Sequence, residues 1–124
     1  MSDWTPEELA NVADATELEL TSTRPDGTFR PYTTMWVVRA GDDLYVRSAY
    51  GANNGWYVRA MVSGRGRIRA GGVERDVTFA EASDDIQADI DSAYWSKYER
   101  YGREIVETVT GPAAKAVTIR LVPR

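Results

Sequence analysis

Short turn sequences constrain the fold of this chain more than any other feature. Three of them, Arg24-Pro25-Asp26-Gly27, Gly41-Asp42-Asp43 and Gly71-Gly72, each separate two segments of strand length. Glycine tolerates the positive φ that tight hairpin turns require, and Pro25 presets a dihedral angle of its turn. Strands joined by so few residues run antiparallel, because a parallel connection needs a long crossover. The turns therefore predict an antiparallel sheet built from hairpins.

The periodicity of the segments around these turns predicts six strands and three helices. Strands are expected at 17–23, 29–39, 44–49, 65–70, 73–81 and 116–122, with Leu18 and Leu20 facing inward. Helices are expected from the Thr5 cap to about Ala13, over 56–62, and from Asp84 to about Gly102. Residues 103–114 remain ambiguous. The order predicts one α+β domain over 1–124, a six-stranded antiparallel β-barrel, because barrel closure removes exposed strand edges.

The chain contains neither histidine nor cysteine. Disulfides, thiolate nucleophiles and iron–sulfur ligands are therefore excluded, and the commonest metal ligand and general base is missing as well. We predict no metal site and single out no catalytic side chain. The remaining chemistry would use carboxylates, hydroxyls or a bound cofactor that supplies the reactive atom, and the cofactor route fits best.

Charge and hydropathy limit the partners and the location of the protein. The net charge of −4 and a pI near 4.8 disfavour a general nucleic-acid binder. No apolar run approaches the roughly 18 residues that a membrane span needs. The N-terminal segment MSDWTPEEL is acidic where a signal peptide would be basic and then apolar. We therefore expect a cytoplasmic protein with no membrane-spanning segment.

Four segments carry a resemblance to a known family: LELTSTRPDGTFRPYTTMWVV, DLYVRSAYGANNGWYVRAMVSGRGRIRAGG, DSAYWSKYERYG and the ending TIRLVPR. Together they resemble a small bacterial family of unknown function, DUF2255, which is similar to the flavin and deazaflavin oxidoreductases of the split-barrel type. The resemblance to the small family spans nearly the whole chain. It implies a split barrel, a homodimer, and FMN or deazaflavin bound in a groove between the barrel and its partner.

The resemblance also implies which residues would cradle the cofactor. The matching stretches are Arg30 to Met35, Ser48 to Gly55 and Trp56 to Arg59. The candidate cofactor-binding residues are Arg30, Tyr32, Thr34, Ser48, Tyr50, Gly51, Asn53, Asn54, Trp56 and Arg59. Arg30 and the loop amides at the helix start are expected to hold phosphate, since free backbone N–H groups beside an arginine form an anion site. Tyr32, Tyr50 and Trp56 are expected to flank the ring.

Two other functions stay open at this point. Deazaflavin relatives usually carry Lys or His with Pro where this chain reads Ala52-Asn53-Asn54-Gly55, and this departure favours a barrel without cofactor that serves as a binding or structural module. Arg65, Arg67 and Arg69 share one strand face and could attract an anionic cofactor tail or single-stranded nucleic acid. Alternatively, Glu74 and Asp76 on the adjoining strand pair with this stripe.

The aromatic residues of the longest expected helix also have two readings. Tyr94, Tyr98 and Tyr101 follow helical spacing, which predicts packing against the barrel or against a partner subunit.

Overall fold

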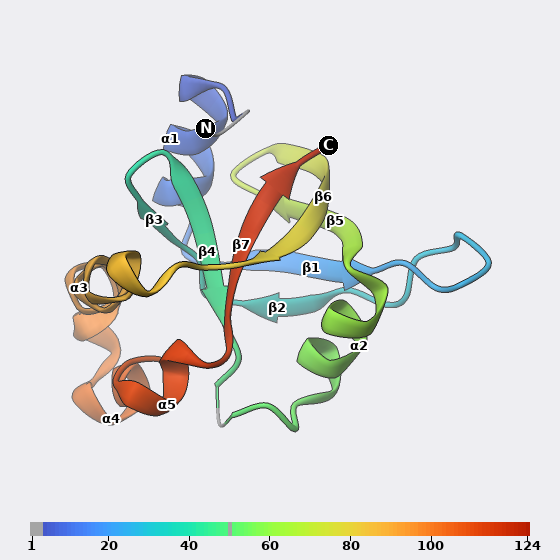
Figure 1. The fold of residues 1–124 in the computed structure, drawn as a ribbon. Helices are drawn as coiled ribbons and strands as arrows, with labels where there is room; N and C mark the ends of the chain where they lie inside the picture. Colours follow the sequence, from blue (N-terminus) through green and yellow to red (C-terminus); the bar gives the residue numbers. More distant parts are fainter. Residues whose placement is uncertain (1–3, 50) are drawn as a thin grey trace.

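The computed structural model describes residues 4–49 and 51–124, which form one seven-stranded antiparallel sheet with helices around it (Figure 1). The strands are β1 (Leu18–Ser22), β2 (Thr33–Met35), β3 (Val38–Ala40), β4 (Asp43–Arg47), β5 (Arg65–Ala70), β6 (Val73–Glu81) and β7 (Thr118–Pro123). The helices are α1 (Pro6–Asp14), α2 (Gly55–Ser63), α3 (Gln87–Tyr98), α4 (Arg103–Glu107) and α5 (Pro112–Lys115). The strand order across the sheet is β2-β1-β5-β6-β7-β4-β3.

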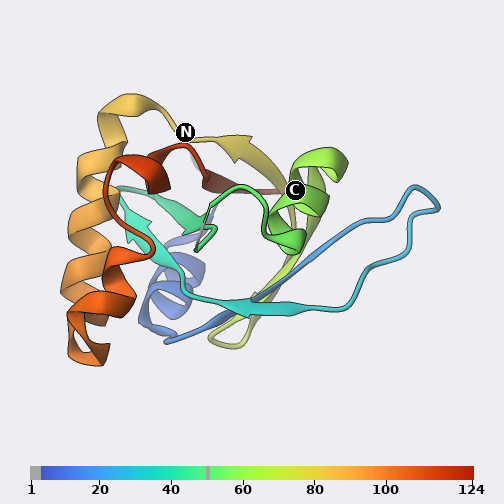
Figure 2. The same ribbon diagram turned by 90° about the horizontal axis from the view of Figure 1, so that it is seen from below.

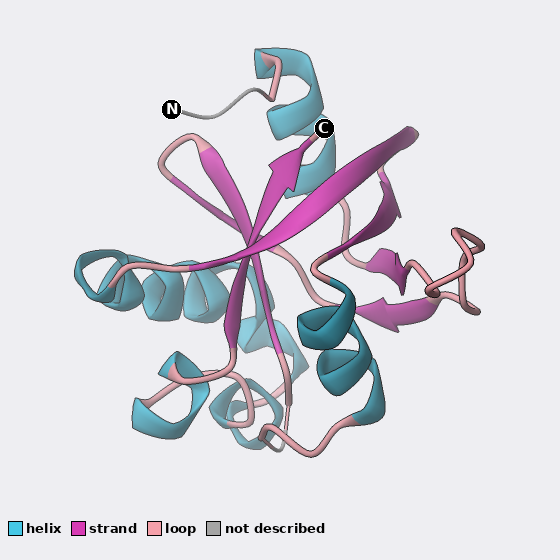
Figure 3. Cartoon of the chain, turned by 45° about the vertical axis from the view of Figure 1, so that its right-hand side comes forward, coloured by secondary structure: helices cyan, strands magenta, loops and turns pink. Residues whose placement is uncertain are grey.

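The prediction of six strands is wrong by one, because the expected strand at 29–39 is divided. Its two parts lie at opposite edges of the sheet, where β2 pairs with β1 and β3 pairs with β4. Only Trp36 and Val37 separate them, and so short a connection spans at most roughly 11 Å. The two edges must therefore approach each other, and the sheet curls into a half-barrel (Figure 3).

The expected strand is divided at Val37 because two distant residues of α3 bind the backbone there. The hydroxyl of Tyr98 accepts a hydrogen bond from the Val37 N–H (3.1 Å), and the Val37 carbonyl accepts one from Lys97 Nζ (2.7 Å). The backbone of Val37 thus finds its partners on α3 instead of on a neighbouring strand. The alternation of apolar and polar residues along the chain does not reveal a hydrogen-bond partner that lies 61 residues away.

The expected hairpins and the N-terminal cap are confirmed. β5 and β6 pair from Ala70 and Val73 outward, and both intervening glycines have positive φ, 56° at Gly71 and 80° at Gly72. At the N-terminus of α1, Thr5 and Glu8 form a reciprocal capping box. The Gly71 turn lies against α1, since a Cβ there would come within 2.2 Å of the Asn11 carbonyl oxygen.

The half-barrel encloses one core, and two helices close it. Leu18 and Leu20 point into this core as predicted, and each is at most 1% exposed. Helix α1 adds Leu9 and Val12, whereas α2 adds Trp56 and Ala60. In Figure 1, α1 lies at one end of the sheet and α2 on the side of β1 and β2.

A second core lies between the outer face of β3 and β4 and the helices α3 and α4. Its buried members are Val38, Ala40, Tyr45, Ile90, Tyr94, Tyr98, Val106 and Val109. Tyr94 and Tyr98 are fully buried, so packing against the barrel is confirmed for both. The ambiguous residues 103–114 hold the short helix α4 and the first three residues of α5. None of the helices in the described ranges has both the length and the apolar character needed to cross a bilayer.

Candidate functional site

An arginine-rich pocket of about 340 Å³ lies between α2 and the connection from β1 to β2. Its arginines come from three parts of the chain: Arg24 and Arg30 from the connection, Arg59 from α2, and Arg65 from the start of β5. The other lining residues are Thr23, Pro25, Val58, Val62 and Ser63. We refer to this site below as the arginine pocket.

The backbone around the arginine pocket is held by hydrogen bonds that continue the β1 pairing. The Arg30 N–H donates to the Ser22 carbonyl (3.1 Å), and the hydroxyl of Thr21 donates to the Arg30 carbonyl. The turn closes with the Arg24 N–H donating to the Thr28 carbonyl at 2.7 Å. The position of Arg30 is therefore set by the strand and not by a free loop.

The guanidinium groups of the pocket have unused hydrogen-bonding capacity. The Nε of Arg30 is buried and has no hydrogen-bond partner among the described residues. Across 4–49 and 51–124, no carboxylate forms an ion pair with Arg30, Arg59 or Arg65. Leaving a buried donor unpaired is costly. An anion in the pocket would pair with these cationic groups, since arginine matches planar or tetrahedral oxyanions in a bidentate way.

A glycine makes room for one of these arginines. A Cβ at Gly55 would lie 2.8 Å from Nη1 of Arg59, so the guanidinium folds back over the first turn of α2. Asn54 caps this helix without a side-chain hydrogen bond. The positive end of the α2 dipole and the Arg59 side chain therefore lie together.

One wall of the pocket is apolar. Val58 and Val62 on α2 are 45% and 84% exposed, and both line the pocket beside the arginines. The pocket thus combines a cationic wall with an apolar wall, a pattern that suits a ligand with an anionic group attached to an apolar body.

The structure brings together only part of the predicted cofactor-binding set. Arg30 and Arg59 meet in the arginine pocket. The Tyr32 ring lies under the Arg69 guanidinium, 4.1 Å from its centre, and Thr34 lines a separate open groove with Arg69. Trp56 is 7% exposed and packs in the barrel core.

The remaining candidates lie on the loop that precedes α2. The Ser48 hydroxyl donates to the Gly51 carbonyl at 2.6 Å, and Gly51 has a φ of 99°. Asn53 and Asn54 are exposed. Tyr50 lies outside the described residues. Arg24 and Arg65 were not among the predicted site residues. The sequence signals that could have identified them are that Arg24 begins the turn after β1 and that Arg65 lies just after α2.

The predicted arginine stripe divides between two roles. Arg67 pairs with Asp76 (2.7 Å) and Arg69 with Glu74 (2.8 Å), so the pairing interpretation is confirmed for these two. Arg65 lines the arginine pocket instead. Two of the three charges on which the nucleic-acid hypothesis depends are therefore already neutralised.

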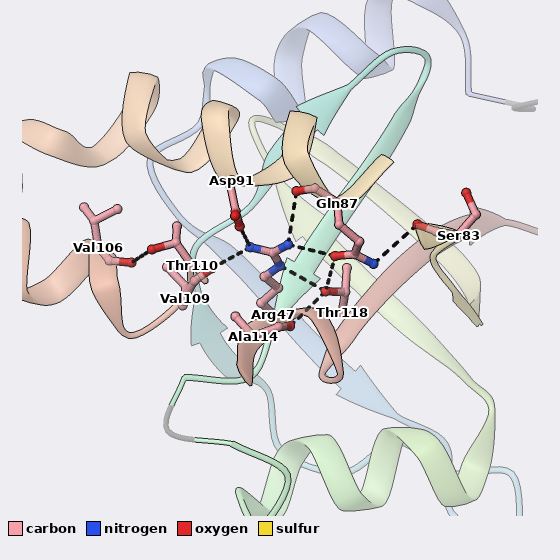
Figure 4. Close-up of polar contacts among 9 residues, drawn as sticks. All are labelled: Arg47, Ser83, Gln87, Asp91, Val106, Val109, Thr110, Ala114 and Thr118. Carbon is pink, nitrogen blue, oxygen red and sulfur yellow. Dashed lines mark hydrogen bonds and ion pairs between the residues drawn. The ribbon is translucent and has the colours of Figure 1, made fainter. Parts of the chain in front are cut away.

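Sequence analysis also missed a buried polar network centred on Arg47 (Figure 4). The Arg47 side chain is fully buried and forms an ion pair with Asp91 of α3. It also donates to the Val109 carbonyl (2.8 Å), to Gln87 Oε1 (2.8 Å) and to the Thr118 hydroxyl (2.9 Å). This network joins the end of β4 to α3, to the segment before α5 and to β7.

Comparisons with solved structures reveal the same fold in several proteins. A putative pyridoxamine 5'-phosphate oxidase from Listeria innocua is 18% identical, with a TM-score of 0.64 over 95% of this chain and 91% of that one. An F420-H2 dependent reductase is 15% identical, with a TM-score of 0.64 over 86% and 93%. A FAD-binding protein from Mesorhizobium loti is 17% identical, with a TM-score of 0.58 over 98% and 91%. At these identities the likeness establishes the split-barrel architecture alone.

Comparison with curated proteins gave no match. The family described as uncharacterized protein conserved in bacteria (DUF2255) matches residues 8–121. The chain therefore belongs to this bacterial family, and it has the half-barrel fold of the oxidase- and reductase-like proteins to which it is similar.

Proposed function

We propose that this protein is a flavin- or deazaflavin-dependent oxidoreductase that holds the phosphate of its cofactor in the arginine pocket. The observation that carries the proposal is a pocket lined by four arginines, of which Arg30, Arg59 and Arg65 form no ion pair with any described carboxylate. The likeness to an F420-H2 dependent reductase and to a FAD-binding protein supports the choice of cofactor class.

Different residues of the chain would bind different parts of the ligand. Arg30 and Arg59 would hold phosphate, and Val58 and Val62 would contact the apolar part of the ligand. Ser48, Gly51, Asn53 and Asn54, with Tyr50, would supply neutral contacts along the loop. A bound flavin or deazaflavin supplies hydride transfer, while the protein orients the ring and excludes water.

We propose that a second copy of the chain covers the arginine pocket. The protein would then be a homodimer with the cofactor in the groove between the copies. The exposed apolar face of α2 supports this arrangement, because Val58, Met61 and Val62 are all more than 40% exposed.

Titration with FMN and with riboflavin tests the phosphate assignment directly. The two ligands share the ring and differ in the phosphate, so FMN is expected to bind at least about tenfold more tightly. In Arg30→Ala, FMN affinity should fall about 10- to 100-fold, while riboflavin affinity should change little. Arg39→Ala, which removes an equal charge on β3, is the control. F420 would be titrated in parallel, and binding would be followed by fluorescence and by melting temperature.

A second function is favoured by the position of Trp56. Because this indole packs in the core, it offers no free face to a flavin ring, which fits a barrel that binds an anionic molecule without redox chemistry. Absence of saturable binding by FMN, riboflavin and F420, together with a purified protein lacking visible absorption, would support this alternative and reject the oxidoreductase.

A further inference from the structure

A second pocket lies away from the arginine pocket, between Trp36, the end of β4 and the segment that follows α4. Its volume is about 210 Å³, and it is lined by Trp36, Arg47, Ala49, Ile105, Thr108 and Val109. Five of these residues offer mainly carbon atoms, and Arg47 is the one charged residue among them. The class of ligand that this pocket can bind therefore depends on whether the Arg47 guanidinium is free to pair with it.

Arg47 uses its N–H donors within the protein: four form short hydrogen bonds, and the fifth makes a longer contact of 3.5 Å with the Gln87 carbonyl. A guanidinium carries five N–H donors. Nε donates to Thr118, Nη1 donates to Asp91 and to the Val109 carbonyl, and Nη2 donates to the side chain and the carbonyl of Gln87 (Figure 4). The Asp91 carboxylate also balances its charge. The floor of the pocket is thus electrically neutral, in contrast to Arg30, Arg59 and Arg65 of the arginine pocket, which form no ion pair with a described carboxylate.

Trp36 gives this pocket a rigid aromatic wall. Its ring stacks flat on Tyr98, with centroids 4.0 Å apart and an interplanar angle of 4°. Tyr98 is fully buried and is anchored by its hydroxyl, which donates to the Thr16 carbonyl at 2.7 Å. Burial raises the pKa of Tyr98 to about 12, so this ring stays neutral at physiological pH. The Trp36 wall is therefore held in place before any ligand arrives.

The Thr108 side chain offers a hydrogen-bond acceptor at the pocket. The Thr108 hydroxyl donates to the Ile105 carbonyl at 2.7 Å, so its proton is used while its oxygen can still accept a hydrogen bond. A ligand with an O–H or N–H donor would satisfy this oxygen.

We propose that this pocket binds a neutral aromatic ring carrying one hydrogen-bond donor, such as a phenol or an indole. The size agrees, because an apolar cavity of roughly 150 Å³ accommodates benzene. A carboxylate on the same ring would be excluded, since it would lose its hydration and find every Arg47 N–H already occupied. The site is independent of the arginine pocket and of the cofactor proposed for it.

Titration with p-cresol and with 4-methylbenzoate at pH 7 tests this proposal, because the two probes share a methyl-substituted ring and differ in charge. We expect p-cresol to shift the NMR signals of the Trp36 indole N–H and the Ile105 methyl groups in a saturable way. The benzoate should bind at least about tenfold more weakly. Benzoate binding as tight as cresol binding would overturn the proposal, as would cresol shifts confined to other residues or no saturable shift.

Two variants fill or close the pocket, and a third serves as control. Ala49→Leu reduces the volume beside Trp36, and Ile105→Glu places a charge at the half-exposed edge; each should weaken cresol binding at least about tenfold. Ala10→Glu adds the same charge on α1 and should leave binding unchanged. Two-dimensional NMR spectra of each variant show whether the fold is retained. Unchanged cresol affinity in both folded pocket variants would overturn the assignment.

Discussion

At the scale of single residues, the Arg47–Asp91 pair is the interaction on which stability should depend most. The Arg47 side chain has no exposed surface, whereas the Asp91 side chain keeps 27% of its own. Removing the partner of a buried charge leaves that charge uncompensated. Asp91→Asn should therefore lower the free energy of unfolding by about 2–3 kcal/mol, measured by urea denaturation at pH 7.

Asp76→Asn is the matched control for that measurement. It makes the same chemical change in the partner of Arg67, but both side chains of this pair are substantially exposed, at 31% and 47%. Surface pairs contribute only about 0–1 kcal/mol, so the loss should be small. Equal losses in the two variants would contradict the structural role assigned to the Arg47 network.

At the scale of elements, the start of α1 makes a pH-dependent contribution to stability. The backbone N–H of Thr5 donates to the Glu8 carboxylate, and with the help of Arg75 it lowers the pKa of Glu8 below its ordinary value of 4.5. A carboxyl whose pKa is lowered by folding stabilises the protein above its unfolded pKa, and this stabilisation is lost as the pH falls through the folded value. Glu8→Gln should therefore be less stable than wild type at pH 7, and the difference should shrink below pH 4.5.

Glu7→Gln provides the comparison for Glu8, because both residues lie in the first turn of α1 and interact with the same helix dipole. Urea denaturation of the three proteins between pH 7 and pH 3 separates the two contributions. Identical pH profiles for the two variants would show that the capping box and Arg75 contribute nothing beyond the dipole.

Local signals predicted those elements whose partners are near in sequence. The Thr5 cap, the Gly71-Gly72 hairpin and the limits of β5 and β6 depend on contacts within a few residues, and all were predicted correctly. The division at Val37 was missed because its partners, Lys97 and Tyr98, lie on a distant helix.

The candidate site was predicted in part, through the family resemblance and not through local signals. Arg30 and Arg59 were selected through the resemblance, and the structure places them in one pocket.

The buried Arg47 could not be predicted from its own strand. The alternation of side chains along β4 puts Leu44 and Val46 inward and Arg47 outward, and only the packing of α3 over that face buries the arginine. No property of residues 43–47 alone distinguishes this arginine from an exposed one.

At the scale of the whole molecule, one surface stands out as unpartnered. The connection between β1 and β2 extends away from the body of the subunit (Figure 2). It lines the arginine pocket together with α2, whose Val58, Met61 and Val62 are exposed side chains. A contiguous apolar patch beside a ligand pocket is typical of a protein interface. A second copy packed on this face would bury the patch and cover the pocket at once.

Sedimentation across protein concentrations tests this dimer. Wild type should sediment as a dimer at micromolar concentration, and Val62→Glu should raise the dimer dissociation constant at least about tenfold, because it buries a charge in the proposed interface. Ile105→Glu makes the same kind of change at an exposed apolar residue of α4, which is 50% exposed, and should sediment like wild type. If Ile105→Glu dissociates the protein and Val62→Glu does not, the interface lies on the α4 face and the arginine pocket stays open to solvent. Met61→Glu changes a residue of the same exposed patch that does not line the arginine pocket, and it should weaken FMN binding as well, because the ligand would lose the wall that the second copy provides.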